Sequence, residues 1–367
     1  MAGDLTKNKQ YFAVVLPSKQ YKKEDKLMAS SILKAKGTLL LKPDRSSLVR
    51  AAAIIKRGGL VAFPTETVYG LGADASCETA VRRIFKAKGR PSDNPLIVHI
   101  CRFAQLEEVA RSLPESVYVL ARRFWPGPLS LVLPRADKIS PAVSAGLDTV
   151  AVRMPDHRVA LELIKASGVP IAAPSANRSG RPSPTSYRHV LEDLAGRIDA
   201  VIKSERCFIG VESTVLDLTG PEPVILRPGG VAREELEAAL NCPVLLSSLK
   251  DKMAVPAAPG MKYRHYSPSA PLFLITGPAE RRSKMINTLA VYYRRQGLKV
   301  GLLNRVIQKF LHCRLEPEHF AAHIYPALRL LDARGTDLIL AEEINTTGLG
   351  LAVMNRLRKA ATRVLRA

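Results

Sequence analysis

Cysteine, aromatic residues and long apolar runs are all scarce in this chain, and each shortage excludes a class of protein. Five cysteines are scattered among 367 residues without a CxxC pair. A disulfide framework or a zinc site is therefore not expected, and a reducing compartment fits. No apolar run approaches the roughly 20 residues of a membrane-spanning helix. The apolar stretch at 12–15 is too short for a signal-peptide core, so we expect a cytoplasmic protein with no membrane partner.

Acidic residues are also few relative to basic ones. The chain has 55 Lys and Arg against 33 Asp and Glu, a net charge of +22, which favours anionic partners such as nucleotides, RNA or an acidic protein. The basic residues are spread along the chain, so charge alone is a weak argument for RNA binding. Residues 1–36 hold eight Lys and three acidic residues without periodicity. They are predicted to form a flexible basic extension.

Helical and strand patterns alternate from residue 37 to 242. Residues 47–59 place apolar side chains at helical spacing before a Gly-Gly stop, and residues 77–88 have one apolar face. Runs rich in β-branched residues between and after them predict strands. The alternation predicts an α/β domain around a twisted mixed sheet. The strands are expected at 96–100, 129–134, 149–155, 170–176, 213–218 and 223–229.

The pattern breaks at residues 243–270, which contain four prolines and end in the run APGMKYRHYSP. This segment is predicted to be a linker. From residue 271 to 367 short strands and helices alternate again with short connections, which is typical of a small parallel α/β domain of Rossmann-like type. The second unit lacks a GxGxxG motif, so nothing indicates that it binds a dinucleotide.

Small polar residues and arginines follow several predicted strands. They occur in FPTETVYGLG (63–72), SANRSGRPSPT (175–185), GVESTVLDL (210–218) and ILRPGG (225–230). Each motif alone is also consistent with an ordinary loop, but α/β proteins build ligand sites at the ends of strands. The set therefore predicts a polar, cationic small-molecule pocket.

No motif for a catalytic nucleophile is present. The chain has no GxSxG and no HExxH motif, and no cysteine has a suitable histidine context. His99 alone is more typical of a structural core histidine. A cationic, hydroxyl-rich pocket without a nucleophile suits chemistry done by positioning and charge stabilisation, such as attack on a phosphate of ATP.

The order of the motifs resembles that of the L-threonylcarbamoyladenylate (threonylcarbamoyl-AMP) synthase family. The motifs are FPTETVYGLG, KAKGRPSDNPLIVHI, FWPGPLSLVL, AGLDTVAVRMP, PIAAPSANRSGRPSPT, GVESTVLDL and LRPGG. APGMKYRHYSP and GLGLAVMNRLRKA resemble its two-domain branch. The resemblance implies a YrdC-like synthase domain over 37–242, a linker over 243–270 that acts as a lid, and a Rossmann-like domain over 271–367.

The resemblance also implies a reaction and its partners. Such enzymes are nucleotidyltransferases that condense L-threonine, bicarbonate and ATP, with Mg²⁺, into L-threonylcarbamoyladenylate and pyrophosphate. A separate complex then transfers the threonylcarbamoyl group to tRNAs that read codons starting with A. Mg²⁺ is expected to be held by phosphates and water rather than directly by the protein. Two alternatives stay open: a basic RNA-binding module without catalysis, and a related carbamoyltransferase, whose paired CxxC zinc motifs are absent here.

The matching motif positions imply two sets of site residues. Arg153 is expected to pair with the carboxylate of threonine through its guanidinium fork. Lys88 and Arg90 are expected to offset the charge on the α-phosphate and so to be catalytic. The threonine-binding positions are Thr67, His99, Arg153, Ala173 and Ser213, and the ATP-binding positions are Arg90, Asn94, Thr149, Ser175, Ser183, Arg227 and Tyr266.

Overall fold

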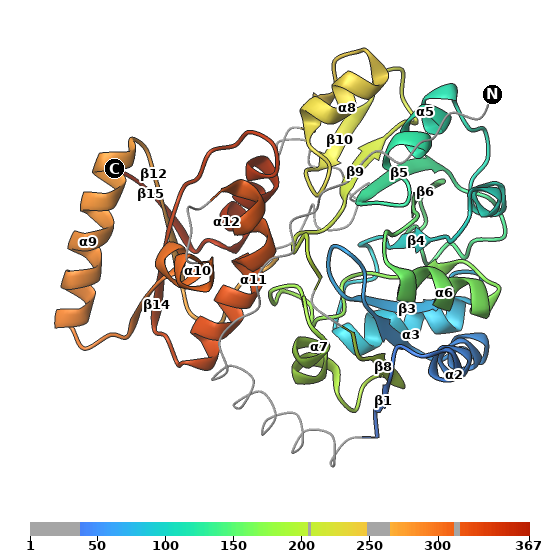
Figure 1. Ribbon diagram of the computed structural model, residues 1–367, viewed down its shortest axis with the longest axis horizontal. Helices are drawn as coiled ribbons and strands as arrows, with labels where there is room; N and C mark the ends of the chain where they lie inside the picture. The colour runs from blue at the N-terminus through green and yellow to red at the C-terminus, as the bar shows by residue number, and fades with distance from the viewer. Residues whose placement is uncertain (1–36, 205–206, 248–264, 312–315) are drawn as a thin grey trace.

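The protein forms two α/β domains that lie side by side (Figure 1). Its structure, a computed structural model, describes residues 37–204, 207–247, 265–311 and 316–367. The predicted basic extension at 1–36 and most of the predicted linker, 248–264, lie outside the described residues. In the part that the structure describes, no helix has the length and apolar character to cross a membrane.

The larger domain is built on a mixed sheet of eleven strands, which confirms the predicted fold class. The strand order is β1-β8-β2-β3-β7-β4-β6-β5-β9-β10-β11, with parallel and antiparallel neighbours. For example, β6 pairs parallel with β4 and antiparallel with β5. The strands are β1 (Leu39–Leu41), β2 (Val61–Phe63), β3 (Gly70–Asp74), β4 (Ile97–His99), β5 (Leu129–Pro134), β6 (Thr149–Arg153), β7 (Ile171–Ala172), β8 (Ala200–Ile202), β9 (Thr214–Asp217), β10 (Val224–Arg227) and β11 (Leu245–Leu246).

Helices cover both faces of this sheet. One face packs against α2 and α6, and the other carries the main apolar core with α3, α5 and α7. The predicted apolar face of residues 77–88 is buried, and α3 ends where Gly89 adopts φ 61°. The helices are α2 (Arg45–Lys56), α3 (Glu78–Lys88), α4 (Leu106–Val109), α5 (Glu115–Phe124), α6 (Arg158–Ser167), α7 (Tyr187–Leu194) and α8 (Arg233–Leu240), with a 3₁₀ turn at Phe103–Gln105.

The smaller domain has four parallel strands in the order β13-β14-β12-β15, as the Rossmann-like prediction required. Helix α9 covers one face of this sheet, and α10, α11 and α12 cover the other. The strands are β12 (Leu272–Thr276), β13 (Val300–Leu302), β14 (Leu338–Glu342) and β15 (Arg363–Arg366). The helices are α9 (Ala279–Arg295), α10 (Leu303–Leu311), α11 (Pro317–Ala333) and α12 (Gly350–Ala360).

Helices α11 and α12 face the larger domain, whereas α9 lies on the far side (Figure 1). Val68 and Val211 of the larger domain share one apolar cluster with Phe320 and Tyr325 of α11. Gly210 shows how close the contact is, because a Cβ there would lie 2.4 Å from the carbonyl oxygen of Ala321. The two domains therefore meet through a packed interface beside two of the polar strand-end motifs.

Candidate functional site

A cavity with an empty volume of about 700 Å³, part of it open to solvent, lies in the larger domain against the start of the smaller one. Strand ends, the turn after β7 and the residues just before β12 form its wall. All of the predicted site residues line it except Asn94 and Thr149. The predicted residues on the wall are Thr67, Lys88, Arg90, His99, Arg153, Ala173, Ser175, Ser183, Ser213, Arg227 and Tyr266.

One end of the cavity is formed by the adjacent strands β4 and β6. Their register places His99 beside Arg153. The Arg153 guanidinium is 4% exposed; its Nη2 lies 2.6 Å from the Glu66 carboxylate, and its Nε donates to the Gly127 carbonyl. Burial and the Arg153 charge lower the pKa of His99 to about 3. A fixed guanidinium and a neutral imidazole thus face the same space.

Hydroxyl groups line the same end. Thr67 is fully buried, and its hydroxyl lies 2.8 Å from that of Thr65. The Ser213 hydroxyl lies 2.8 Å from that of Ser130 and accepts from Arg227 at 3.2 Å. This end can therefore recognise a small ligand that has both a carboxylate and hydrogen-bonding groups.

The other end is cationic. Lys88 is 2% exposed, and its ammonium donates at 2.5 Å to the carbonyls of Ser175 and Asn177. Burial and the nearby Arg90 charge lower the pKa of Lys88 well below its ordinary value. Lys88 thus holds the turn after β7 while it lines the cavity, and its role in offsetting phosphate charge stays a prediction. The Arg90 guanidinium folds over its own turn and donates to the carbonyls of Asn94 and Pro95.

Two predicted ATP-binding residues are not on the cavity wall. The Asn94 side chain is fully buried, and its amide atoms have no hydrogen-bond partner among the described residues. Thr149 starts β6 and pairs with Pro134. It lies four residues before Arg153, about 13 Å along a strand. The assignments of Asn94 and Thr149 therefore stay predictions.

The structure also places residues in the cavity that the sequence did not single out. Glu212 is 6% exposed, and its carboxylate accepts from the Ser183 hydroxyl at 2.5 Å. The sequence clue to Glu212 was its position directly before Ser213, where a carboxylate stands among apolar and hydroxyl side chains. His265 and Arg181 also line the wall. Burial and the Arg90 charge lower the pKa of His265 to about 3.

Comparison with known proteins follows the same two-domain division. The family model described as Telomere recombination matches residues 53–229, and the model of the threonylcarbamoyl-AMP synthase C-terminal domain matches residues 231–362. A threonylcarbamoyl-AMP synthase of Pyrococcus abyssi is 51% identical over 315 residues, which cover 85% of this chain and 93% of that protein. One of Bacillus subtilis is 49% identical over 320 residues, which cover 86% and 92%.

The fold of this chain also agrees with that of a solved structure. The crystal structure of P. abyssi Sua5 complexed with L-threonine superposes with a TM-score of 0.83 at 47% sequence identity, and the match covers 90% of this chain and 99% of that chain. Sequence, domain order and fold agree over nearly the whole length of the relatives. The chain belongs to the threonylcarbamoyl-AMP synthase family.

Proposed function

We propose that this cavity condenses L-threonine, bicarbonate and ATP into L-threonylcarbamoyladenylate and pyrophosphate. The chain is then the nucleotidyltransferase of the first step of threonylcarbamoyladenosine formation in tRNAs that read codons starting with A. The observation that carries the proposal is one cavity with a buried Arg153 and neutral His99 at one end, Lys88 and Arg90 at the other, and Arg227 beside Ser213. Family membership and the L-threonine complex of P. abyssi Sua5 support it.

The threonine end suits an amino acid. The Arg153 fork binds the carboxylate, and Glu66 keeps the guanidinium in place from behind. Ala173 at the end of β7 leaves room for the substrate, while Thr67 and Ser213 supply hydrogen bonds to its polar groups. At neutral pH His99 is uncharged and does not attract the triphosphate into the wrong end.

The chemical step needs positioning more than a protein nucleophile. The amine of threonine combines with bicarbonate, with loss of water, or with CO₂, with loss of a proton, to give a carbamate. A carbamate oxygen then attacks the α-phosphorus of ATP, and pyrophosphate leaves. Arg90 and Arg227 stabilise charge on the phosphates, and Lys88 fixes the Ser175–Asn177 turn that contacts the nucleotide. Each residue thus acts by fixing atoms or charge at one end of the cavity.

The donor set of the cavity fits a metal that arrives with the nucleotide. Across the described residues, no group of three His, Cys, Asp or Glu could hold a metal ion. Mg²⁺ bound through phosphate oxygens and water requires no such group. When bound, it neutralises part of the triphosphate charge, while Arg90 and Arg227 face the same phosphates.

Pyrophosphate release tests the proposal. Purified protein is given ATP, Mg²⁺ and bicarbonate, with and without L-threonine, and the adenylate product is identified by mass spectrometry. Release that requires both threonine and bicarbonate is the expected result. Release without threonine indicates another substrate or a simple ATPase, and either outcome rejects the proposal.

We also propose the cellular setting of this reaction. It takes place in the cytoplasm, and a separate complex accepts the threonylcarbamoyl group for transfer to tRNA. The net charge of +22 supports weak RNA binding as an accompanying property. A gel-shift titration with unmodified tRNA at several salt concentrations measures that affinity directly.

A further inference from the structure

The smaller domain contacts a buried carboxylate of the cavity wall, that of Glu212 in the larger domain. Its Oε1 accepts from the Ser183 hydroxyl at 2.5 Å and from the Tyr325 hydroxyl at 3.1 Å. Its Oε2 accepts from Tyr325 at 2.9 Å and from the Arg356 Nε at 2.8 Å. Tyr325 belongs to α11 and Arg356 to α12, and both side chains are fully buried. The carboxylate therefore joins the two domains at the predicted ATP end.

The charge of Glu212 depends on that contact. Although burial raises the pKa of a carboxyl group, the Arg356 and Arg227 guanidinium groups lower the pKa of Glu212 to about 2. A buried carboxylate without a cation would be costly, and its charge would repel a triphosphate. Arg356 thus neutralises an anion that faces the nucleotide cavity while it keeps that anion able to hold the Ser183 hydroxyl.

The same two residues also hold the end of the linker. The Tyr266 ring lines the cavity and stacks on the Tyr325 ring, with centroids 5.7 Å apart and planes inclined by 28°. The central guanidinium carbon of Arg356 lies 5.2 Å from the Tyr266 centroid. Tyr266 has φ 66°, a backbone conformation that needs such support outside glycine.

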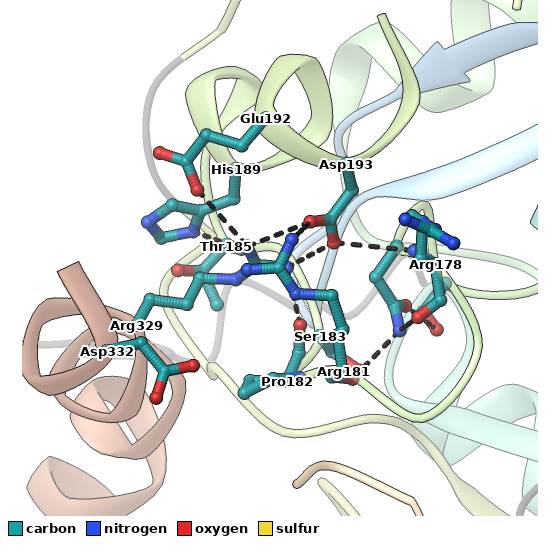
Figure 2. Close-up of polar contacts among 12 residues, drawn as sticks. Arg178, Arg181, Pro182, Ser183, Thr185, His189, Glu192, Asp193, Arg329 and Asp332 are labelled. Carbon is teal, nitrogen blue, oxygen red and sulfur yellow. Dashed lines mark hydrogen bonds and ion pairs between the residues drawn. The ribbon is translucent and has the colours of Figure 1, made fainter. Parts of the chain in front are cut away.

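Arg329 of the smaller domain makes a second contact, with the turn just before Ser183. Figure 2 shows Arg329 of α11 reaching α7 and the turn before Ser183. Its Nη2 donates to the Pro182 carbonyl and to the Asp193 carboxylate, both at 2.7 Å. Asp193 also pairs with Arg181, which lines the cavity. Ser183 therefore lies between two groups of contacts that both come from the smaller domain.

We propose that Arg356 and Tyr325 are positioning residues for ATP. They fix the ionised Glu212, through it the Ser183 hydroxyl, and they hold Tyr266 against the cavity. The C-terminal domain is thus a structural part of the nucleotide site. This inference rests on the proposed function for the identity of the nucleotide, and the threonine end takes no part in it.

Tyr325→Phe is the mildest test, because it removes one hydroxyl and keeps the ring that stacks on Tyr266. We expect KM and Kd for ATP to rise about tenfold, the effect of losing a hydrogen bond to a charged group, and KM for L-threonine to change less than twofold. Arg356→Gln should lower kcat/KM for ATP by about a hundredfold, and Arg356→Lys should restore much of it because the charge returns. Lower thermal stability with unchanged ATP parameters would mean a purely structural role and would overturn the proposal.

A double-mutant cycle tests the route through Glu212. In a Ser183→Ala background, Tyr325→Phe should change ATP affinity much less than in the wild-type chain, since the hydroxyl that it helps to fix is gone. If the fold-changes in ATP affinity caused by the two substitutions simply multiply in the double variant, transmission through Glu212 is rejected. The matched control is Arg358→Gln on the same helix, whose exposed side chain pairs with Glu343 of its own domain; its ATP parameters should not change.

The assay separates this inference from the proposed function. Calorimetry measures ATP binding without turnover, so the Tyr325→Phe and Arg356→Gln comparisons give a result whether or not the chain forms the adenylate. If the wild-type chain binds ATP but releases no pyrophosphate in the presence of threonine, only the proposed function is rejected. Unchanged ATP affinity in both variants, with threonine-dependent release intact, rejects the positioning role alone.

Discussion

The two ends of the cavity are built in different ways. At the threonine end, Arg153 is fixed by Glu66 and by the Gly127 carbonyl, all within the larger domain. At the ATP end, Ser183 is fixed by Glu212, whose other partners come from α11 and α12 of the smaller domain. Under the proposed function, amino-acid recognition depends on one domain and nucleotide recognition on two. Variants that affect one end without the other test this difference.

Loss of Arg153 should have the largest effect. Arg153→Ala removes the carboxylate-binding fork, and we expect threonine-dependent turnover to fall about a thousandfold, as when one partner of a buried charge pair is removed. ATP affinity measured by calorimetry should stay within twofold, because no contact of Arg153 reaches Glu212. The variant also leaves Glu66 without its cation, so the double variant Arg153→Ala, Glu66→Gln is the control that recovers stability and not turnover. An equal loss of ATP affinity would contradict the separation of the two ends.

Arg90→Ala should affect the other end. It removes a cation near the phosphates, and we expect kcat to fall by about a hundredfold, as for other preorganised charge-stabilising groups. The melting temperature should change little, because the hydrogen bonds of Arg90 to the Asn94 and Pro95 carbonyls stay within its own turn. Lys86→Ala, an exposed position on α3 just before that turn, is the matched control and should retain full activity. A kcat for Arg90→Ala equal to that of the wild-type chain would remove Arg90 from the mechanism.

Gly210→Ala should weaken the contact between the two domains without changing a charged group. Its φ of 79° and the 2.4 Å approach to the Ala321 carbonyl leave no space for a Cβ, so we expect a loss of about 1–3 kcal/mol of stability. KM for ATP should rise more than Kd for threonine. Gly297→Ala has a similar φ of 84° with nothing within 4 Å; it should show the backbone cost of ~1 kcal/mol and no change in KM for ATP. If both variants change KM for ATP equally, the contact between the domains has no role in ATP binding.

The sequence indicated some neighbours in the cavity and not others, for a physical reason. The family resemblance implied that His99 and Arg153 lie together, and the structure places them side by side at the ends of β4 and β6. Glu212 and Arg356 are separated by 144 positions and lie in different domains, and no local pattern encodes that pairing. Nor does spacing reveal where a flexible side chain points, so nothing in the sequence indicated that the Lys88 ammonium donates to the turn after β7.

A further effect should appear in the pH dependence of unfolding, to which the buried histidines of the cavity contribute. His99 has a folded pKa of about 3 against an ordinary value of 6.5. The unfolded chain binds the extra proton, so this stability is complete above pH 6.5 and falls by up to about 1.4 kcal/mol per pH unit as the pH drops towards 3. Glu212, with a pKa of about 2 against 4.5, contributes stability that is lost only below about pH 4.5. Melting temperatures from pH 7 to 4 should therefore fall less steeply for His99→Asn than for the wild-type chain, while Glu212→Gln should keep the wild-type slope above pH 5. An unchanged slope for His99→Asn would assign the acid sensitivity to another group, such as His265, whose pKa is also about 3.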